Sequence, residues 1–270
     1  MKKYFKDLNI IRLIACIAVL LYHLNILKGG YLAVCTFFVL TGYLSCISAF
    51  RKEKFSLKEY YKNRLFKIYL PLVIVVFISI GIISFLPNIF WFNLKPETTS
   101  VLLGYNNFWQ LNANLDYFAR HVDSPFMHFW YIGILLQFDL VFPFIYLGLK
   151  ELGDHVKKYI PCLFTGFFAI VFALYFYISS KDTNIMVVYY NTFTRIFSIL
   201  FGLTLGFIHH YYGILINKKI QKMKLRKVIF YVYLLLLLLS FILIPSTSEY
   251  FSIAMIIVSL ISMRLIDYAT

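Results

Sequence analysis

The sequence predicts an all-α fold, a polytopic transmembrane bundle of about eight helices. Hydrophobic residues make up 61% of the 270 residues and charged residues only 14%, which is far less charge than a soluble domain of this length carries. The apolar residues also gather in stretches of roughly 20, the length at which a helix crosses the hydrocarbon of a bilayer. We interpret residues 1–270 as one membrane domain.

The apolar stretches predict the spans in order along the chain. We expect them at residues 8–27, 31–50, 68–87, 126–148, 159–179, 187–208, 228–245 and 250–267. No short apolar segment is followed by a small-residue cleavage site, so we interpret the first stretch as a retained span and not as a signal peptide. Residues 88–125 form the only long loop that this pattern leaves.

The net charge of +14 is distributed as in a membrane protein. Lysine and arginine crowd alternate loops, whereas the intervening loops hold only Lys28, Lys95, Arg120 and Lys181. The positive-inside rule therefore predicts a cytoplasmic N-terminus, with anionic lipid headgroups as contacts of the basic loops. We expect no nucleic-acid partner. The four cysteines lack the spacing of metal ligands, so we expect no metal either.

The first span carries two polar residues that set it apart from an ordinary membrane helix. Arg12 and His23 are eleven residues apart, which places them on nearly the same helix face and about 16 Å apart along the axis. Taken singly, Arg12 could reach lipid phosphate and His23 could bond to a neighbouring helix. A cation and an imidazole on one face favour a functional site, because both are costly in hydrocarbon unless they face protein or a polar cavity.

Further polar residues mark the other spans. Arg64 and Lys67 are three residues apart, so an α-helix would present both on one face, which suits either a phosphate ligand or a positive-inside anchor. Asp139 and Arg195 lie inside predicted spans, with Arg195 near mid-membrane. We expect these two to pair, either as a structural link between helices or in a catalytic role.

Five segments in this order resemble the acyltransferase-3 family of integral membrane O-acyltransferases. They are the Arg12 to His23 spacing, TFFVLTGY at 36–43, the basic pair Arg64 and Lys67, YNNFWQLNANLDYF at 105–118, and SPFMHFWYIGILLQFDLVFP at 124–143. The segment at 105–118 is similar to the outer loop of members that O-acetylate peptidoglycan in Gram-positive bacteria.

The resemblance implies an O-acetyltransferase of the bacterial plasma membrane. The donor would be cytoplasmic acetyl-CoA, with no tightly bound cofactor, and the acceptor a hydroxyl of an extracytoplasmic glycan, either peptidoglycan or a surface polysaccharide. The residues implied fall into three groups: His23, Arg195 and Asp139 in catalysis; Arg12, Arg64 and Lys67 in donor binding; His128 and Trp130 near the acceptor.

The chain departs from the family pattern at three points. Leu135 occupies the position of a family glutamate, with Asp139 one turn later as a candidate substitute. Lys67 replaces a second arginine, which keeps the charge but loses the bidentate fork. The family usually has about ten spans, so an inactive truncated member is one alternative. A transporter or flippase of a glycan or lipid-linked substrate is another, although the chain shows no inverted repeat. Neither the acceptor nor the oligomeric state follows from the sequence.

Overall fold

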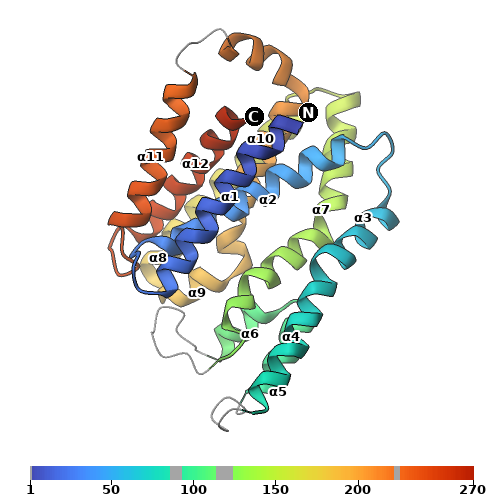
Figure 1. Cartoon of the computed structure of the whole chain (residues 1–270). Helices are drawn as coiled ribbons and strands as arrows, with labels where there is room; N and C mark the ends of the chain where they lie inside the picture. Colours follow the sequence, from blue (N-terminus) through green and yellow to red (C-terminus); the bar gives the residue numbers. More distant parts are fainter. Residues whose placement is uncertain (1, 86–92, 114–123, 222–225) are drawn as a thin grey trace. The chain divides into compact units, whose positions relative to one another are not determined.

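Helices build the described part of the computed structural model, which covers residues 2–85, 93–113, 124–221 and 226–270 (Figure 1). The α-helices are α1 (Lys2–His23), α2 (Ala33–Phe50), α3 (Leu57–Arg64), α4 (Leu70–Ile83), α5 (Leu94–Leu102), α6 (Asn106–Asn112), α7 (Trp130–His155), α8 (Ile160–Asp182), α9 (Ile185–Tyr190), α10 (Thr192–Gln221), α11 (Arg226–Leu243) and α12 (Phe251–Ala269). Short turns of other helix types are η1 (Gly30–Leu32), η2 (Leu65–Tyr69) and η4 (Met127–Phe129). No strand occurs in these ranges, which confirms the all-α prediction.

Seven of the described helical segments are long and apolar enough to cross a membrane. They are Gly30–Phe50, Leu57–Ile83, Met127–His155, Ile160–Asp182, Thr192–Gly213, Arg226–Leu243 and Phe251–Ala269. Helix α1 corresponds to the first predicted span. The polytopic bundle predicted from hydropathy is therefore confirmed.

The chain forms two compact units. Unit 1 comprises residues 1–51, 149–182 and 193–270, and unit 2 comprises residues 52–148 and 183–192. Most of α7 belongs to unit 2, and its last turns belong to unit 1.

Small residues bring α2, α10 and α12 together in unit 1. A Cβ atom at Gly42 of α2 would collide with the Ile199 carbonyl of α10, and one at Gly202 would collide with the Val39 carbonyl of α2. Glycine at these two crossings lets the backbones approach closely, as small residues do in membrane bundles. Hydroxyl pairs then join α12 to its neighbours: Thr36 to Ser262 at 2.8 Å and Ser198 to Ser259 at 2.8 Å.

Helix α1 ends earlier than the predicted limit at residue 27. Asn25 takes a left-handed conformation with φ 59°. The Asn25 N–H donates to the Tyr22 carbonyl at 3.0 Å and the Ile26 N–H to the Leu21 carbonyl at 2.9 Å, the two bonds of a Schellman cap. This cap makes His23 the last residue of the helix.

The span Leu57–Ile83 of unit 2 begins with the capped helix α3, which a π-turn joins to α4. Ser56 caps α3 by accepting a hydrogen bond from the Glu59 N–H at 3.4 Å. Residues Leu65–Tyr69 then form the π-turn η2, directly before Pro71. Proline has no N–H to donate, so an α-helical ladder cannot continue unchanged through this point. Helix α4 then runs on as the apolar half of the span.

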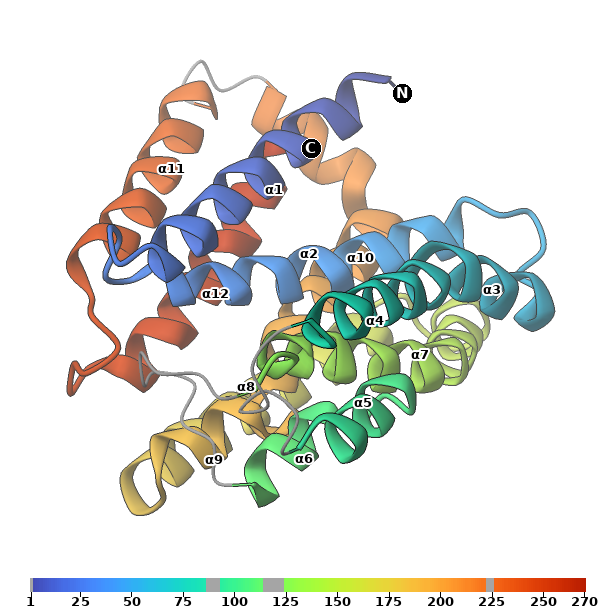
Figure 2. The ribbon, with the colours of Figure 1, turned by 60° about the horizontal axis from the view of Figure 1, so that its bottom comes forward.

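Helix α4 packs against the segment that hydropathy predicts as a long loop. Buried Leu72 and Val76 of α4 form a core with Val101 of α5 and Phe126. Figure 2 shows α5 and α6 as separate short helices of unit 2. The loop prediction is thus wrong for 94–102 and 106–112, although Trp91 and residues 114–118 lie outside the described residues.

A second correction concerns the predicted span at 187–208. Asn191 has an extended backbone with ψ 131°, which ends α9 at Tyr190, and α10 begins at Thr192. Arg195 therefore lies in the first turn of its helix, whereas the predicted bounds place it eight residues into the span.

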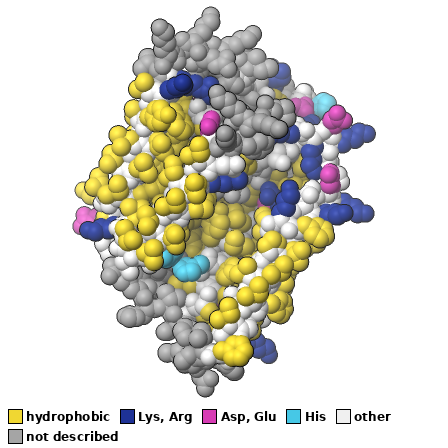
Figure 3. Space-filling view, viewed as in Figure 1, with side chains coloured by type: hydrophobic (Ala, Val, Ile, Leu, Met, Phe, Trp, Pro, Cys, Tyr) yellow, Lys and Arg dark blue, Asp and Glu magenta, His cyan; other side chains and the backbone are white. Residues whose placement is uncertain are grey.

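Hydrophobic side chains cover much of the surface, as Figure 3 shows for one face. On α11, Tyr231, Val232, Leu235 and Leu239 are exposed. Helix α8 likewise exposes leucine and phenylalanine side chains. Such helices need lipid around them, in agreement with a membrane protein.

Candidate functional site

One face of α1 carries exposed polar side chains. Arg12, Cys16 and His23 are all exposed and, at spacings of four and seven residues, share this face. The buried residues of the helix form the neighbouring side of it: Leu8, Ile11, Ala15 and Ala18. The sequence prediction of a shared Arg12–His23 face is consistent with this burial pattern, and Cys16 is a nucleophile on the same face that spacing alone could have found.

Aromatic rings surround the His23 end of α1 within unit 1. The His23 ring meets Tyr22 edge to face at 5.4 Å between centroids, and Tyr22 lies 5.8 Å from Tyr31. Tyr31 is buried and stacks on Phe251 at 5.4 Å. Gly30 makes this packing feasible, because a Cβ there would meet the Ala18 carbonyl of α1. The helix end that carries His23 is thus fixed by aromatic contacts.

Arg195 is fully buried at the start of α10 in the same unit. Its guanidinium contacts Met255 Sδ at 3.2 Å and Cys35 Sγ at 3.8 Å, and it lies 5.5 Å from the centre of the Phe38 ring. These contacts place a positive charge between α2 and α12, in low-dielectric surroundings.

The predicted partner of Asp139 is corrected by the structure. The Asp139 carboxylate pairs with Arg64 Nη2 at 3.1 Å and accepts a hydrogen bond from the Tyr60 hydroxyl at 2.9 Å. Arg64 also lies over the Tyr60 ring, 5.1 Å from its centre. All three residues belong to unit 2, whereas Arg195, the expected partner, belongs to unit 1. Nothing in the sequence distinguishes Tyr60 from the rest of the 22 tyrosines.

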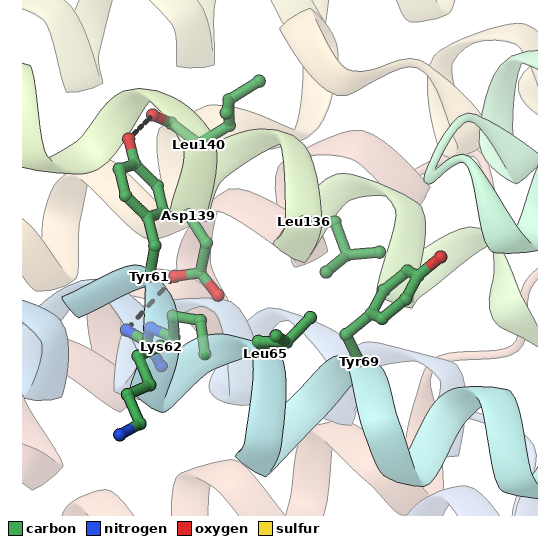
Figure 4. A pocket seen from close by; sticks show the side chains of 8 residues that line it. Tyr61, Lys62, Leu65, Tyr69, Leu136, Asp139 and Leu140 are labelled. Atoms are coloured by element: carbon green, nitrogen blue, oxygen red, sulfur yellow. Dashed lines mark hydrogen bonds and ion pairs between the residues drawn. The ribbon is translucent and has the colours of Figure 1, made fainter. Parts of the chain in front are cut away.

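A groove of about 360 Å³ opens beside this ion pair. It is lined by Tyr61, Lys62, Arg64, Leu65, Tyr69, Leu136, Asp139 and Leu140 (Figure 4). Lys67, predicted to share a face with Arg64, is exposed but does not line the groove. The π-turn that begins at Leu65 changes the helical phase between the two basic residues, so only Arg64 reaches the groove.

The two residues predicted near the acceptor differ in exposure. His128 is exposed at the start of the α7 span. Trp130 is only 1% exposed and packs on Tyr189 at 4.8 Å and Tyr190 at 5.8 Å between ring centres. A ring in this position has no free face for a sugar, so Trp130 is a packing residue in this structure.

A buried polar cluster, not expected from the sequence, joins α5 and α6 to the start of the α7 span. Glu97 is fully buried and accepts hydrogen bonds from Gln110 Nε2 at 2.9 Å and from the Ser124 hydroxyl. Burial raises the pKa of the Glu97 carboxyl above its ordinary value, while the bonds from Ser124, Gln110 and the Phe126 backbone N–H act in the opposite direction. The Oε2 atom of Glu97 has no hydrogen-bond partner among the described residues.

Comparison with known proteins supports the family resemblance of the sequence. An acyltransferase-3 family model, described as an acyltransferase domain, matches residues 5–268. A Staphylococcus aureus strain COL protein named "Putative O-acetyltransferase SACOL0978" is 33% identical over 217 residues, which cover 76% of this chain and 35% of that protein. The O-acetyltransferase OatA of S. aureus strain NCTC 8325 is 29% identical over 214 residues, again 76% of this chain and 35% of the relative. The matched region is thus about a third of each relative's length. No solved structure matches the chain.

Because the family model spans nearly the whole chain, this protein belongs to the acyltransferase-3 family.

Proposed function

We propose that this chain is a membrane O-acetyltransferase that moves an acetyl group from cytoplasmic acetyl-CoA to a hydroxyl of an extracytoplasmic glycan. The observation that carries the proposal is the exposed α1 face with Arg12 at one end and His23 at the other, in a member of a family of acyltransferases. The two relatives named as O-acetyltransferases support the acyl group and the oxygen acceptor. Peptidoglycan or a surface polysaccharide is the proposed acceptor.

Arg12 on the α1 face of unit 1 is proposed to supply positive charge for the donor's phosphates, and Arg64 beside the groove of unit 2 is a second candidate. A guanidinium suits phosphate because its planar set of donors matches the oxygen geometry. Lys67 is exposed and adds a point charge, although it lies outside the groove beside Arg64. From Arg12 the α1 face rises about 16 Å to His23, a span that an extended pantetheine arm could follow.

His23 is proposed as the general base. Its neutral ring takes the proton from the acceptor hydroxyl, whose oxygen then attacks the thioester carbonyl. The C–O bond forms, the C–S bond breaks, and the CoA sulfur leaves with the electron pair and accepts a proton to become a thiol. Arg195 supplies positive charge for the oxyanion of the tetrahedral intermediate, an effect that low-dielectric surroundings strengthen. Asp139, engaged with Arg64, has no direct part in this step.

On the outer side, His128 is the exposed residue proposed to contact the acceptor. Trp130 supports it from the core by packing on Tyr189 and Tyr190.

Protection of Cys16 from alkylation tests donor binding on the α1 face. In a Cys162→Ser background the other cysteines, Cys35 and Cys46, are buried, so a maleimide reports mainly on Cys16. Acetyl-CoA should slow labelling of Cys16, and Arg12→Ala should remove this protection while leaving the basal labelling rate unchanged. Equal labelling with and without acetyl-CoA would count against donor binding here and would favour the transporter alternative.

A further inference from the structure

The groove in unit 2 has two chemically different parts. Its walls are apolar, formed by Leu65, Tyr69, Leu136 and Leu140, and its charged end holds the Arg64–Asp139 ion pair. Figure 4 shows the Asp139 carboxylate turned toward α3, while Lys62 extends away from it. This combination fits a ligand with an anionic head and a less polar arm.

Arg64 is held tightly for a residue at the edge of a groove. Its side chain is 29% exposed, whereas that of Asp139 is 6% exposed. Tyr60 contacts both partners, because its hydroxyl donates to Asp139 and its ring lies below the guanidinium. Asp139 is thus a nearly buried carboxylate that contacts one cation, Arg64, and one hydroxyl, that of Tyr60.

A carboxylate in this place competes with any phosphate for the same cation. A phosphate that approaches Arg64 has to displace Asp139 or tolerate a second negative charge within a few ångströms, and both cost free energy in a partly buried setting. A groove with this carboxylate should therefore bind anions more weakly than the same groove without it.

We propose that Asp139 is an internal competitor for Arg64 and sets the affinity of the groove for the phosphate-bearing arm of the acetyl donor. The inference rests on the proposed function for the identity of the ligand. The inference adds a specific role for Asp139 to that proposed function. The carboxylate pairs with Arg64 when the groove is empty, and the pair separates when phosphate binds Arg64. The apolar walls then contact the less polar part of the arm.

The test is donor binding by the purified full chain with Asp139→Asn. Asparagine keeps the shape and can still accept from Tyr60, but it removes the competing charge. The dissociation constant for acetyl-CoA, measured by calorimetry, should fall by about tenfold, equivalent to about 1.4 kcal/mol. Added salt should weaken binding by the variant more than by wild type, since no carboxylate at position 139 then competes with phosphate for Arg64. An unchanged or weaker affinity overturns the proposal.

A second variant covers the case in which Asp139→Asn does not fold. Tyr60→Phe keeps the ring under Arg64 but removes the bond to Asp139, so it should tighten acetyl-CoA binding by a smaller factor, about twofold to threefold. No tightening contradicts the proposal. Vesicles of phosphatidylglycerol serve as a competing anion source: if Asp139→Asn changes binding to vesicles but not to acetyl-CoA, the groove is a lipid site and the proposal fails.

The result also separates this inference from the proposed function. If wild type binds no acetyl-CoA but Asp139→Asn does, the inference stands and the donor role in the native chain is in question. If neither binds it, the inference is overturned, whereas the acetyltransferase activity is judged separately by the cellular assay described below.

Discussion

At the scale of single residues, two carboxyl groups of unit 2, Glu97 and Asp139, are buried, where an ionised carboxylate costs free energy. Glu97 is fully buried and bonded to neutral donors, Gln110, Ser124 and a backbone N–H. Asp139, in contrast, is paired with Arg64. The two carboxyl groups of unit 2 thus meet different surroundings: Glu97 contacts neutral donors, and Asp139 contacts a cation.

We predict a pH-dependent stability that Glu97 causes. Its folded-state pKa is raised, so its stabilising contribution is complete below the unfolded pKa of about 4.3 and is lost as pH rises through the folded pKa. Glu97→Gln keeps the shape without the charge. The melting temperature of wild type should therefore fall relative to that of the variant as pH rises from about 4 to about 8. Parallel melting curves across this range would show that the carboxyl does not change protonation on folding.

The polar residues of the spans could be found from the sequence because charges are rare in apolar segments. Arg12, His23, Asp139 and Arg195 all stood out in this way. Their partners could not be found: Arg64 and Asp139 are distant in sequence, and the pairing depends on how α3 packs on α7. Glu97 lay in a predicted loop, where an acidic residue carries no signal of burial.

At the scale of elements, close helix crossings and a half-buried side-chain relay hold unit 1 together. The relay runs from Tyr43 of α2 to His209 of α10 and on to Asp267 of α12, with distances of 3.1 Å and 2.8 Å. Since ionised Asp267 only accepts, His209 Nε2 carries a proton. In the neutral ring, Nδ1 then accepts from the Tyr43 hydroxyl.

Loss of this relay should destabilise the bundle. His209→Ala removes the hydrogen bond from α10 to Asp267 of α12 and leaves a cavity between the helices, at a cost of about 1–3 kcal/mol in the free energy of unfolding. His155→Ala is the matched control, because the His155 side chain is 72% exposed. Denaturant titration in detergent should place the midpoint of the first variant below that of wild type and leave the control unchanged. Equal midpoints for the two variants would show that the relay contributes nothing.

Substitution of the glycine at the α2–α10 crossing should also destabilise the bundle. Gly42→Ala places a methyl group against the Ile199 carbonyl, so the helices must separate, at a cost of about 1–3 kcal/mol. Gly81→Ala in α4 meets nothing within 4 Å, and it should be neutral or stabilising by up to about 1 kcal/mol. Thermal unfolding of the two variants under the same conditions compares their melting temperatures. A melting temperature for Gly42→Ala at or above that of Gly81→Ala would contradict the close helix crossing.

Elements were predicted well where an apolar run is long and poorly where local geometry decides. The runs that became α8, α11 and α12 were placed within a few residues. The break at Asn191 and the π-turn before Pro71 were missed, because each is a local backbone choice inside an apolar stretch. Helices α5 and α6 were missed because they are short and polar.

At the scale of the whole molecule, the distribution of basic residues predicts the membrane orientation. We predict that the segment between α2 and α3 faces the cytoplasm and that the end of α8 faces outward. In a cysteine-free background, Lys54→Cys should react with a membrane-impermeant maleimide only after cells are permeabilised, whereas Lys181→Cys should react in intact cells. The opposite pattern would invert the orientation and with it the assignment of donor and acceptor sides.

The central claim is that His23 acts as the base in O-acetyl transfer to an extracytoplasmic glycan. The most direct measurement is base-labile O-acetyl on purified wall and surface glycans, after deletion of the gene and complementation with wild type, His23→Ala or the control His155→Ala. Deletion should lower the O-acetyl content, wild type and His155→Ala should restore it, and His23→Ala should not, since loss of a general base costs about 10²-fold to 10⁴-fold in rate. Full restoration by a His23→Ala protein that is present in the membrane at wild-type levels would contradict the account.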